Sequence, residues 1–313
     1  MTDWLSSMQQ TYEYYIVDPG TWKDSTRLDN VISSSIERDS SLETLGSASF
    51  EIAESVGECY IRPYLVTIQN GVRDRYPLGT YLIQTPSSKF DGKIRNVTMD
   101  AYTPLIELKE SPPPIGYSVS KHSNIMDTAC QIYREHTRAP IVEVSNTETL
   151  YSDFVANTDD TWLTFGKDLI ANAKYEVSLD DLGRVLFSPK QEIASLQPVW
   201  TYDDGNSSIL YPEITMDHDL YGIPNVVEVV YSNGEHTYNA KVINADPNSP
   251  TSTISRGREI LYRETNPSLG NPTNDQIQEY ATKLLKELSS IEYTISYTHG
   301  YCLVRLNDCV LLN

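Results

Sequence analysis

Cysteine and long apolar runs are scarce in this 313-residue sequence, and each absence excludes a class of protein. The four cysteines contain no CxxC pair, and no charged-then-apolar segment opens the chain. We therefore expect folding in a reducing cytoplasm without disulfides. Cys302 and Cys309 are near enough in sequence to meet across a hairpin, but buried free thiols are the favoured interpretation. No apolar run approaches the roughly 18 residues of a membrane-spanning helix, so no direct membrane span is expected.

Basic residues are also scarce: 24 Lys and Arg stand against 43 Asp and Glu, which gives a formal net charge of −19. The acidic excess is present in every third of the chain. Sequence-specific binding of nucleic acid needs a Lys/Arg surface for the phosphates and is therefore not expected. An acidic surface suits something that DNA must slide past without sticking, because like charges repel. The alternative from charge alone is that many soluble proteins are simply acidic.

The usual catalytic signatures are absent. The sequence has no GxxxxGK[ST] loop, no GxGxxG after a strand and no GxSxG elbow. The best local cluster is Asp217-His218-Asp219, but neighbours on a strand point to opposite faces, so at most the two acids share one. We interpret it as a solvated acidic edge, and we expect His236, after a hairpin turn, at the surface. We therefore assign no catalytic, cofactor-binding or metal-binding residue and no cofactor, and we expect no enzymatic activity.

Phenylalanine is scarce, with 5 residues, whereas tyrosine is abundant, with 22. Tyrosine suits half-buried strands and wet interfaces because it joins an apolar ring to a polar tip. The composition therefore fits β structure with much contact surface. It also fits a glycan-binding module, in which aromatic rings stack on sugars.

Residues 158–189 combine one amphipathic helix with one hairpin. Short polar side chains at 158–160 are expected to cap the helix, and Trp162 opens its apolar face and is expected in a core. The period then changes to two, which predicts strands at 175–179 and 184–188 joined by a tight turn. One helix and one hairpin cannot bury both apolar faces, so this unit must dock on other strands or on another chain.

Residues 12–110 are predicted to form a six- or seven-stranded antiparallel barrel or sandwich. Residues 1–11 are expected to form an N-terminal arm for a neighbour, with Trp4 on its apolar side. Asn70-Gly71 is a good hairpin signal. Alternating residues predict the strands at 12–17, 31–37, 48–52, 59–69, 72–76, 80–85 and 95–108.

Residues 111–116 form a proline-rich linker, expected to be a stiff spacer. The segment 117–199 that follows is predicted to be a small α+β domain. Its first helix carries Ile125 and Ile132 on one face, with Ser120 or Ser123 as the cap, and ends before Pro140.

Residues 200–313 are predicted to form a second β-barrel domain with a late helix at 273–290. That helix opens with a capping box of Thr273 and Gln276. Asn233-Gly234 predicts a hairpin between strands at 225–231 and 237–244. The loop 245–258 is expected either to wrap a neighbour or to be mobile.

Three regions carry a resemblance to a known family. They are Leu78-Gly79-Thr80-Tyr81-Leu82-Ile83 followed by Thr98-Met99-Asp100-Ala101-Tyr102, the unit from Trp162 to Pro189, and the segment from Tyr297 to Leu312. Together with the order of the segments, they resemble the hub proteins of phage tails and baseplates, relatives of the late control proteins of contractile tails.

The resemblance implies a fold that is mainly β with an α+β insertion: two tail-tube-like antiparallel β-barrels plus a small helix-hairpin domain. Hubs of this family are homotrimers whose paired barrels form a pseudo-sixfold ring, so the two barrels, 12–110 and 200–313, are expected to superpose. The ring matches a hexameric tail tube protein above and a trimeric spike or tip protein below. Many relatives carry a further lysozyme or peptidase domain. No such domain is expected in this sequence, so the resemblance does not imply lytic activity.

The function indicated by this resemblance is that of a structural baseplate hub in a virion tail, assembled in the host cytoplasm. The tape measure protein and then DNA would pass through its acidic channel, without sequence-specific contact. The alternative is a glycan-binding receptor protein or a tail-associated cell-wall hydrolase, with tyrosines as sugar platforms.

Overall fold

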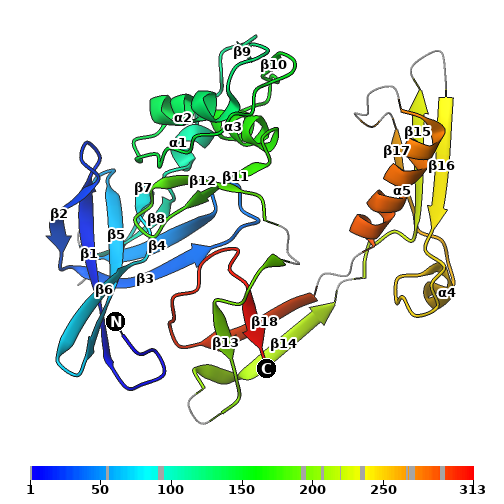
Figure 1. Ribbon diagram of the computed structural model, residues 1–313. Helices are drawn as coiled ribbons and strands as arrows, with labels where there is room; N and C mark the ends of the chain where they lie inside the picture. The colour runs from blue at the N-terminus through cyan, green and yellow to red at the C-terminus, as the bar shows by residue number, and fades with distance from the viewer. Residues whose placement is uncertain are drawn as a thin grey trace. The chain divides into compact units, whose positions relative to one another are not determined.

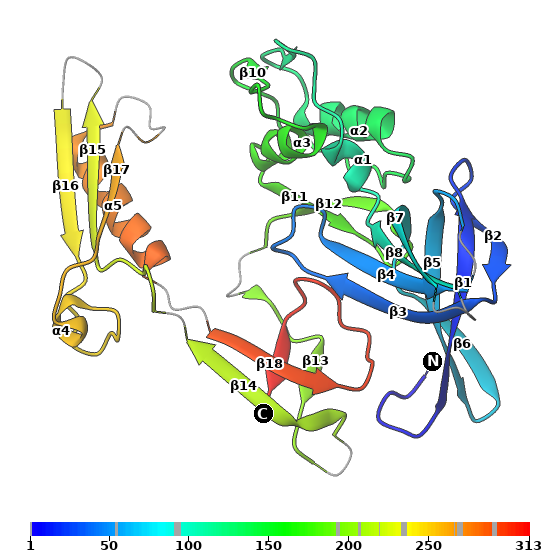
Figure 2. The same cartoon turned by 180° about the vertical axis from the view of Figure 1, so that it is seen from behind.

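The computed structural model describes residues 2–53, 56–90, 95–191, 195–205, 208–218, 220–232, 237–265, 267, 272–289 and 293–313. The chain divides into two compact units, Met1–Ile209 with Tyr301–Asn313, and Leu210–Gly300. Figures 1 and 2 show the ribbon from opposite sides, with the strands of the first sheet in blue and cyan.

The first unit is built on one antiparallel sheet of eight strands. They run in the order β2-β1-β5-β7-β8-β4-β3, and β6 pairs with β5 outside this path. The sequence predicted every strand except β2, whose residues show no apolar alternation. The strands are β1 (Gln9–Asp18), β2 (Lys23–Leu28), β3 (Val31–Arg38), β4 (Gly46–Ile52), β5 (Tyr60–Gln69), β6 (Val72–Pro77), β7 (Tyr81–Phe90) and β8 (Arg95–Tyr102).

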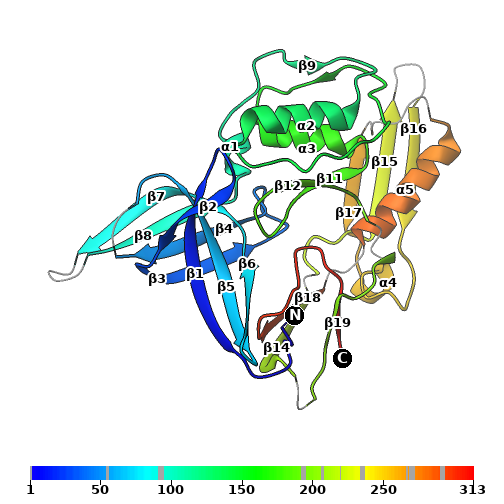
Figure 3. The ribbon, with the colours of Figure 1, turned by 60° about the vertical axis from the view of Figure 1, so that its left-hand side comes forward.

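One side of this sheet covers a hydrophobic core to which alternate residues of its strands contribute. In β4, Phe50 and Ile52 are fully buried, whereas Ser49 and Glu51 beside them are half-buried on the other side. The predicted antiparallel strands are therefore present (Figure 3). The predicted closure is not, because the described pairings leave β2 and β3 as the two ends of the path.

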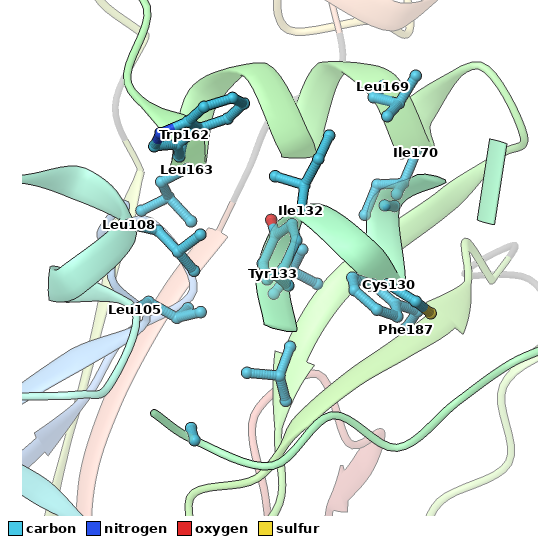
Figure 4. Close-up of a cluster of buried hydrophobic side chains, with 14 of the residues drawn as sticks. Leu105, Leu108, Cys130, Ile132, Tyr133, Trp162, Leu163, Leu169, Ile170 and Phe187 are labelled. Atoms are coloured by element: carbon cyan, nitrogen blue, oxygen red, sulfur yellow. The ribbon is translucent and has the colours of Figure 1, made fainter. Parts of the chain in front are cut away.

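Short helices and a hairpin follow the sheet. They are α1 (Ile106–Lys109), β9 (Ser118–Val119), α2 (Ile125–His136), β10 (Phe154–Val155), α3 (Trp162–Ala171), β11 (Tyr175–Leu179) and β12 (Val185–Pro189). Figure 4 shows the core between them, with Trp162, Tyr133 and Phe187 among its members. Tyr60 and Leu82 of the sheet belong to the same core. The linker at 111–116 therefore does not separate two independent cores, which differs from the expected spacer.

The helix caps differ from those expected. Thr161, not residues 158–160, caps α3, and its side chain and that of Thr164 form a reciprocal capping box. Asp160 instead accepts a hydrogen bond from the backbone N–H of Asn157, which makes a turn ahead of the helix. Asn124 caps α2 in place of a serine, and its carbonyl-type Oδ1 accepts from the N–H of Asp127 at 2.9 Å.

The N-terminal segment packs on its own chain. The Trp4 ring is buried, 4.9 Å from the ring of Tyr76 and 5.2 Å from that of Tyr301. The Thr2 and Thr67 hydroxyls share a buried hydrogen bond of 2.8 Å. The expectation of an arm reaching a neighbour therefore fails for these residues, because Trp4 finds aromatic partners within its own unit.

The second unit is a three-stranded sheet with one covering helix and a separate ribbon. The helix α5 packs on the face of the sheet that carries Val227, Val229 and Ala240. Thr273 and Gln276 cap it as predicted. The elements are β14 (Leu210–His218), β15 (Val226–Ser232), β16 (Thr237–Ile243), α4 (Thr253–Arg256), β17 (Leu261–Thr265), α5 (Asn274–Leu288) and β18 (Tyr293–His299).

Residues 200–313 do not form one barrel in the described part of the chain. β13 (Trp200–Tyr202) and β19 (Val310–Leu312) pair in parallel within the first unit, and β14 pairs with β18. The alternation that suggested barrel strands in β15 and β16 arises because one face of each strand packs on α5. The two-barrel arrangement is thus not confirmed. The predicted turn at Asn233-Gly234 lies outside the described residues.

The loop 245–258 is held inside its own unit by polar contacts. Thr251 and Ser252 are almost fully buried. The Asn244 side-chain amide donates to the hydroxyls of Ser249 and Thr251 at 3.0 and 3.3 Å, and Ser252 caps α4. This packing differs from both expectations for the loop, because its hydroxyl side chains bond to one another.

We expect Trp162→Ala to lower the free energy of unfolding by about 3–5 kcal/mol, since the ring is buried and stacks on His136 at 4.2 Å. Chemical denaturation followed by circular dichroism measures this. Tyr151→Ala is the matched control, because that ring is 82% exposed. Equal stability of the Trp162 variant and the wild type would contradict the packing shown in Figure 4.

Candidate functional site

The turn between β11 and β12 attaches the segment from α1 to β12, called the helical part below, to the first sheet. The carbonyl oxygen of Leu182 accepts hydrogen bonds from Trp22 Nε1 at 2.9 Å, Arg62 Nη2 at 3.1 Å and Thr80 Oγ1 at 2.8 Å. Gly183 has a φ of +74°, and a Cβ there would lie 2.7 Å from the Thr80 Cβ. Only glycine therefore fits this close approach.

The neighbouring Asp181 joins the turn to two further segments. Its carboxylate accepts from Arg38 Nη1 at 3.2 Å and from Arg305 Nη2 and Nε at 2.6 and 2.8 Å. These hydrogen bonds raise the pKa of Arg305 above its ordinary value. A pocket of about 520 Å³ adjoins the cluster, lined by these charged groups together with leucines such as Leu186. The cluster ties the C-terminal segment to the hairpin and offers no nucleophile.

The outer side of β3, β4 and β8 carries only small polar, acidic and tyrosine side chains. Cross-strand pairing places them in three rows: Glu37-Ser47-Tyr102, Ser35-Ser49-Asp100 and Ser33-Glu51-Thr98. We call these nine residues the acidic face. The Ser33 hydroxyl donates to Glu51 at 3.1 Å and the Ser47 hydroxyl to Glu37 at 3.3 Å. No Lys or Arg is among the nine, and three of them, Glu37, Glu51 and Asp100, carry carboxylates.

A second charged surface lies on β1, β2, β5 and β6. We call it the arginine network: Glu13, Asp24, Arg27, Asp29, Arg62, Arg73 and Arg75. The carboxylate of Glu13 is nine-tenths buried, and three guanidinium groups surround it: Arg27 at 3.1 Å, Arg73 at 2.8 Å and Arg75 at 3.4 Å. One carboxylate is thereby shared among three cations.

Aromatic rings and a buried ion pair hold the network rigidly. Arg75 lies over the rings of Tyr64 and Tyr15, at 4.0 and 4.9 Å from their centroids. Arg62, 3% exposed, pairs with Asp24 at 2.8 Å. Arg75 and Arg62 are therefore held by these contacts, whereas Arg27 and Arg73 are half-exposed.

The ribbon of β14 and β18 has two chemically different faces. Met216 lies opposite Ile295 in register, and Ile214 is two residues along the same face; all three are exposed. The other face pairs Thr215 with Ser296 and Asp217 with Thr294. The ribbon thus has an uncovered apolar face and a polar, acidic one.

Of the Asp217-His218-Asp219 cluster and His236, the structure describes the side chain of Asp217. Asp217 lies on β14, whereas Asp219 and His236 and the side chain of His218 lie outside the described residues. Among the described side chains, no group of three His, Cys, Asp or Glu residues is placed to hold a metal ion.

The four cysteines are free thiols; Cys130 and Cys302 are buried, whereas Cys59 and Cys309 are half-buried, so the predicted burial holds for Cys302 and not for Cys309. Cys302 is buried, with its sulfur 3.3 Å from the Tyr202 hydroxyl, and burial raises the pKa of the thiol. It is therefore poorly suited to act as a nucleophile. In the described part of the chain, no helix has both the length and the apolar character needed to cross a bilayer.

No protein-family model matches the chain, and no curated protein matches it. Solved structures do. A tail protein from Neisseria meningitidis matches with a TM-score of 0.64 and 14% identity, over 96% of this chain and 86% of that one. The 43 kDa tail protein of prophage MuSo2 from Shewanella oneidensis matches with a TM-score of 0.61 and 10% identity, over 96% and 88%.

A prophage tail protein from Listeria monocytogenes also matches, with a TM-score of 0.52 and 13% identity, over 96% of this chain and 84% of that one. At these identities the likeness establishes the fold alone, which this chain shares with these three tail proteins, two of them from prophages. The resemblance drawn from the sequence is therefore confirmed as far as a tail-protein fold, and the assignment to the hub proteins stays a prediction.

We expect Gly183→Ala to destabilise the protein by about 2 kcal/mol or more, because a methyl group would meet Thr80 and the φ is strained. Gly116→Ala is the matched control: its φ is +79°, but its Cβ would meet nothing within 4 Å. It should cost only about 1 kcal/mol, the conformational part alone. Equal losses in thermal melts would show that the close approach to Thr80 contributes nothing.

Proposed function

We propose that this protein is a structural component of a phage tail, located in the virion as the baseplate hub. The observation that carries the proposal is the shared fold: 96% of the chain matches each of three phage tail proteins, and it spans 84–88% of their lengths. The names of these three neighbours describe tail proteins, which supports a structural role for this chain.

In this proposal the chain assembles, in the host cytoplasm, as a homotrimeric ring between a hexameric tail tube and a trimeric spike or tip. The tape measure protein and then DNA leave through the ring. Open edges support an assembly of this kind, since β2 and β3 have no second partner strand among the described pairings. Exposed strand edges are normally covered. The uncovered apolar face of the β14–β18 ribbon, with Met216 54% exposed, supports it too, because a two-stranded ribbon is marginal alone.

The polar face of the ribbon is our candidate for the channel wall. Glu213, Thr215 and Asp217 lie on one side of β14, and neither described strand of the ribbon contains a Lys or Arg. Such a wall repels phosphates weakly within a Debye length of about 8–10 Å, whereas a basic wall would hold them.

Mass photometry of the full chain at rising concentration tests the proposal. We expect a species of three times the monomer mass, and binding of the tail tube and tip proteins of the same phage. A chain that stays monomeric and binds neither protein would contradict it. Saturable binding of a cell-surface glycan by such a monomer would favour the receptor-binding alternative.

A further inference from the structure

The arginine network has a net positive charge, although the chain as a whole is strongly acidic. Its four guanidinium groups stand against the three carboxylates of Glu13, Asp24 and Asp29. The side chains of Arg27 and Arg73 are half-exposed, at 50% and 49%, although each already touches Glu13. Each guanidinium carries five N–H donors, so donors remain free to bind a further carboxylate from outside.

The acidic face has the complementary chemistry. A shallow pocket of about 190 Å³ opens on it, lined by Glu37 and Asp100 and by the hydroxyls of Ser35, Ser47 and Ser49. These side chains present carboxylate and hydroxyl oxygens as acceptors, and carboxylates bind the planar guanidinium fork in bidentate geometry. An arginine side chain is therefore the natural occupant of this pocket.

Both surfaces lie on the same side of one continuous sheet, the side opposite the core that contains Phe50 and Met99. A row of paired residues connects them from strand to strand: Glu37, Ser47, Tyr102, Leu82, Tyr60 and Val17. Along β1, Tyr15 and Glu13 follow Val17 on that side. Because strand pairing fixes both surfaces in one rigid sheet, they cannot meet each other within a single copy.

We propose that the arginine network of one copy docks on the acidic face of a second copy, with Arg27 and Arg73 meeting Glu37 and Asp100. The inference rests on the proposed ring and identifies the contact that would build it. The two surfaces differ, so the contact is head-to-tail, and each bound copy leaves one surface open for the next. A repeated contact of this kind closes into a ring when the rotation between copies permits.

Charge reversal on each face, and then on both, tests the contact. Arg27→Glu with Arg73→Glu makes the network acidic, and Glu37→Lys with Asp100→Lys makes the acidic face basic. Each pair alone should raise the concentration for half-assembly, measured by mass photometry, by about tenfold or more. The chain that carries all four substitutions restores opposite charges and should regain assembly. In the wild type, raising the salt concentration should also raise the concentration for half-assembly, because salt screens the charges.

Two controls separate this contact from a loss of folding. Arg134→Glu reverses an arginine of similar exposure on α2, 56%, and should leave assembly unchanged. The milder Arg73→Gln and Asp100→Asn remove charge without reversal, and circular dichroism melts of every variant report the fold.

Loss of assembly with either reversal and its recovery in the combined variant support the contact. Assembly that neither reversal weakens, or that the combined variant fails to regain, overturns it and leaves the ring itself standing. A wild-type chain that remains monomeric at every concentration contradicts both the contact and the ring.

Discussion

One backbone carbonyl, that of Leu182, connects the two halves of the first unit. It accepts hydrogen bonds from Arg62 of β5 and from Trp22 and Thr80, which immediately precede β2 and β7. The backbone comes so close to Thr80 that only glycine fits at position 183. Arg62, buried beneath the turn, binds this carbonyl and also Asp24 of the arginine network. The helical part, the sheet and one charged surface therefore depend on the same few atoms, because a buried guanidinium left without its partners would be costly.

This junction explains why residues 2–209 form one unit in spite of the proline-rich segment at 111–116. The helices α2 and α3 cannot bury both of their faces against the β11–β12 hairpin, so they share a core with the sheet through Tyr60 and Leu82. The opposite side of the sheet has a second core. On its other side, the sheet is covered by the helical part only around Tyr60 and Leu82. The acidic face and the arginine network lie on that same side, beyond the covered area.

Local signals predicted much of the fold. The α3 helix, the β11–β12 hairpin and the capping box of α5 follow from spacing and turn chemistry within about fifteen residues. Strand pairing between segments far apart in the sequence could not be predicted from these local signals. The parallel pairing of β13 with β19 and the packing of α5 on β15 are set by tertiary contacts that periodicity does not encode. The charged surfaces were missed for the same reason: Glu13 and Arg73 are sixty residues apart, and only strand pairing brings them together.

The proposed ring would use the strands β2 and β3, which have no second partner strand among the described pairings, and the two surfaces of opposite charge. Electron cryomicroscopy of the purified full-length chain, under conditions where it assembles, tests this most directly. We expect closed threefold rings around an open axial channel whose wall is acidic or neutral. Particles without rotational symmetry, or rings whose channel wall is continuously positive, would contradict it.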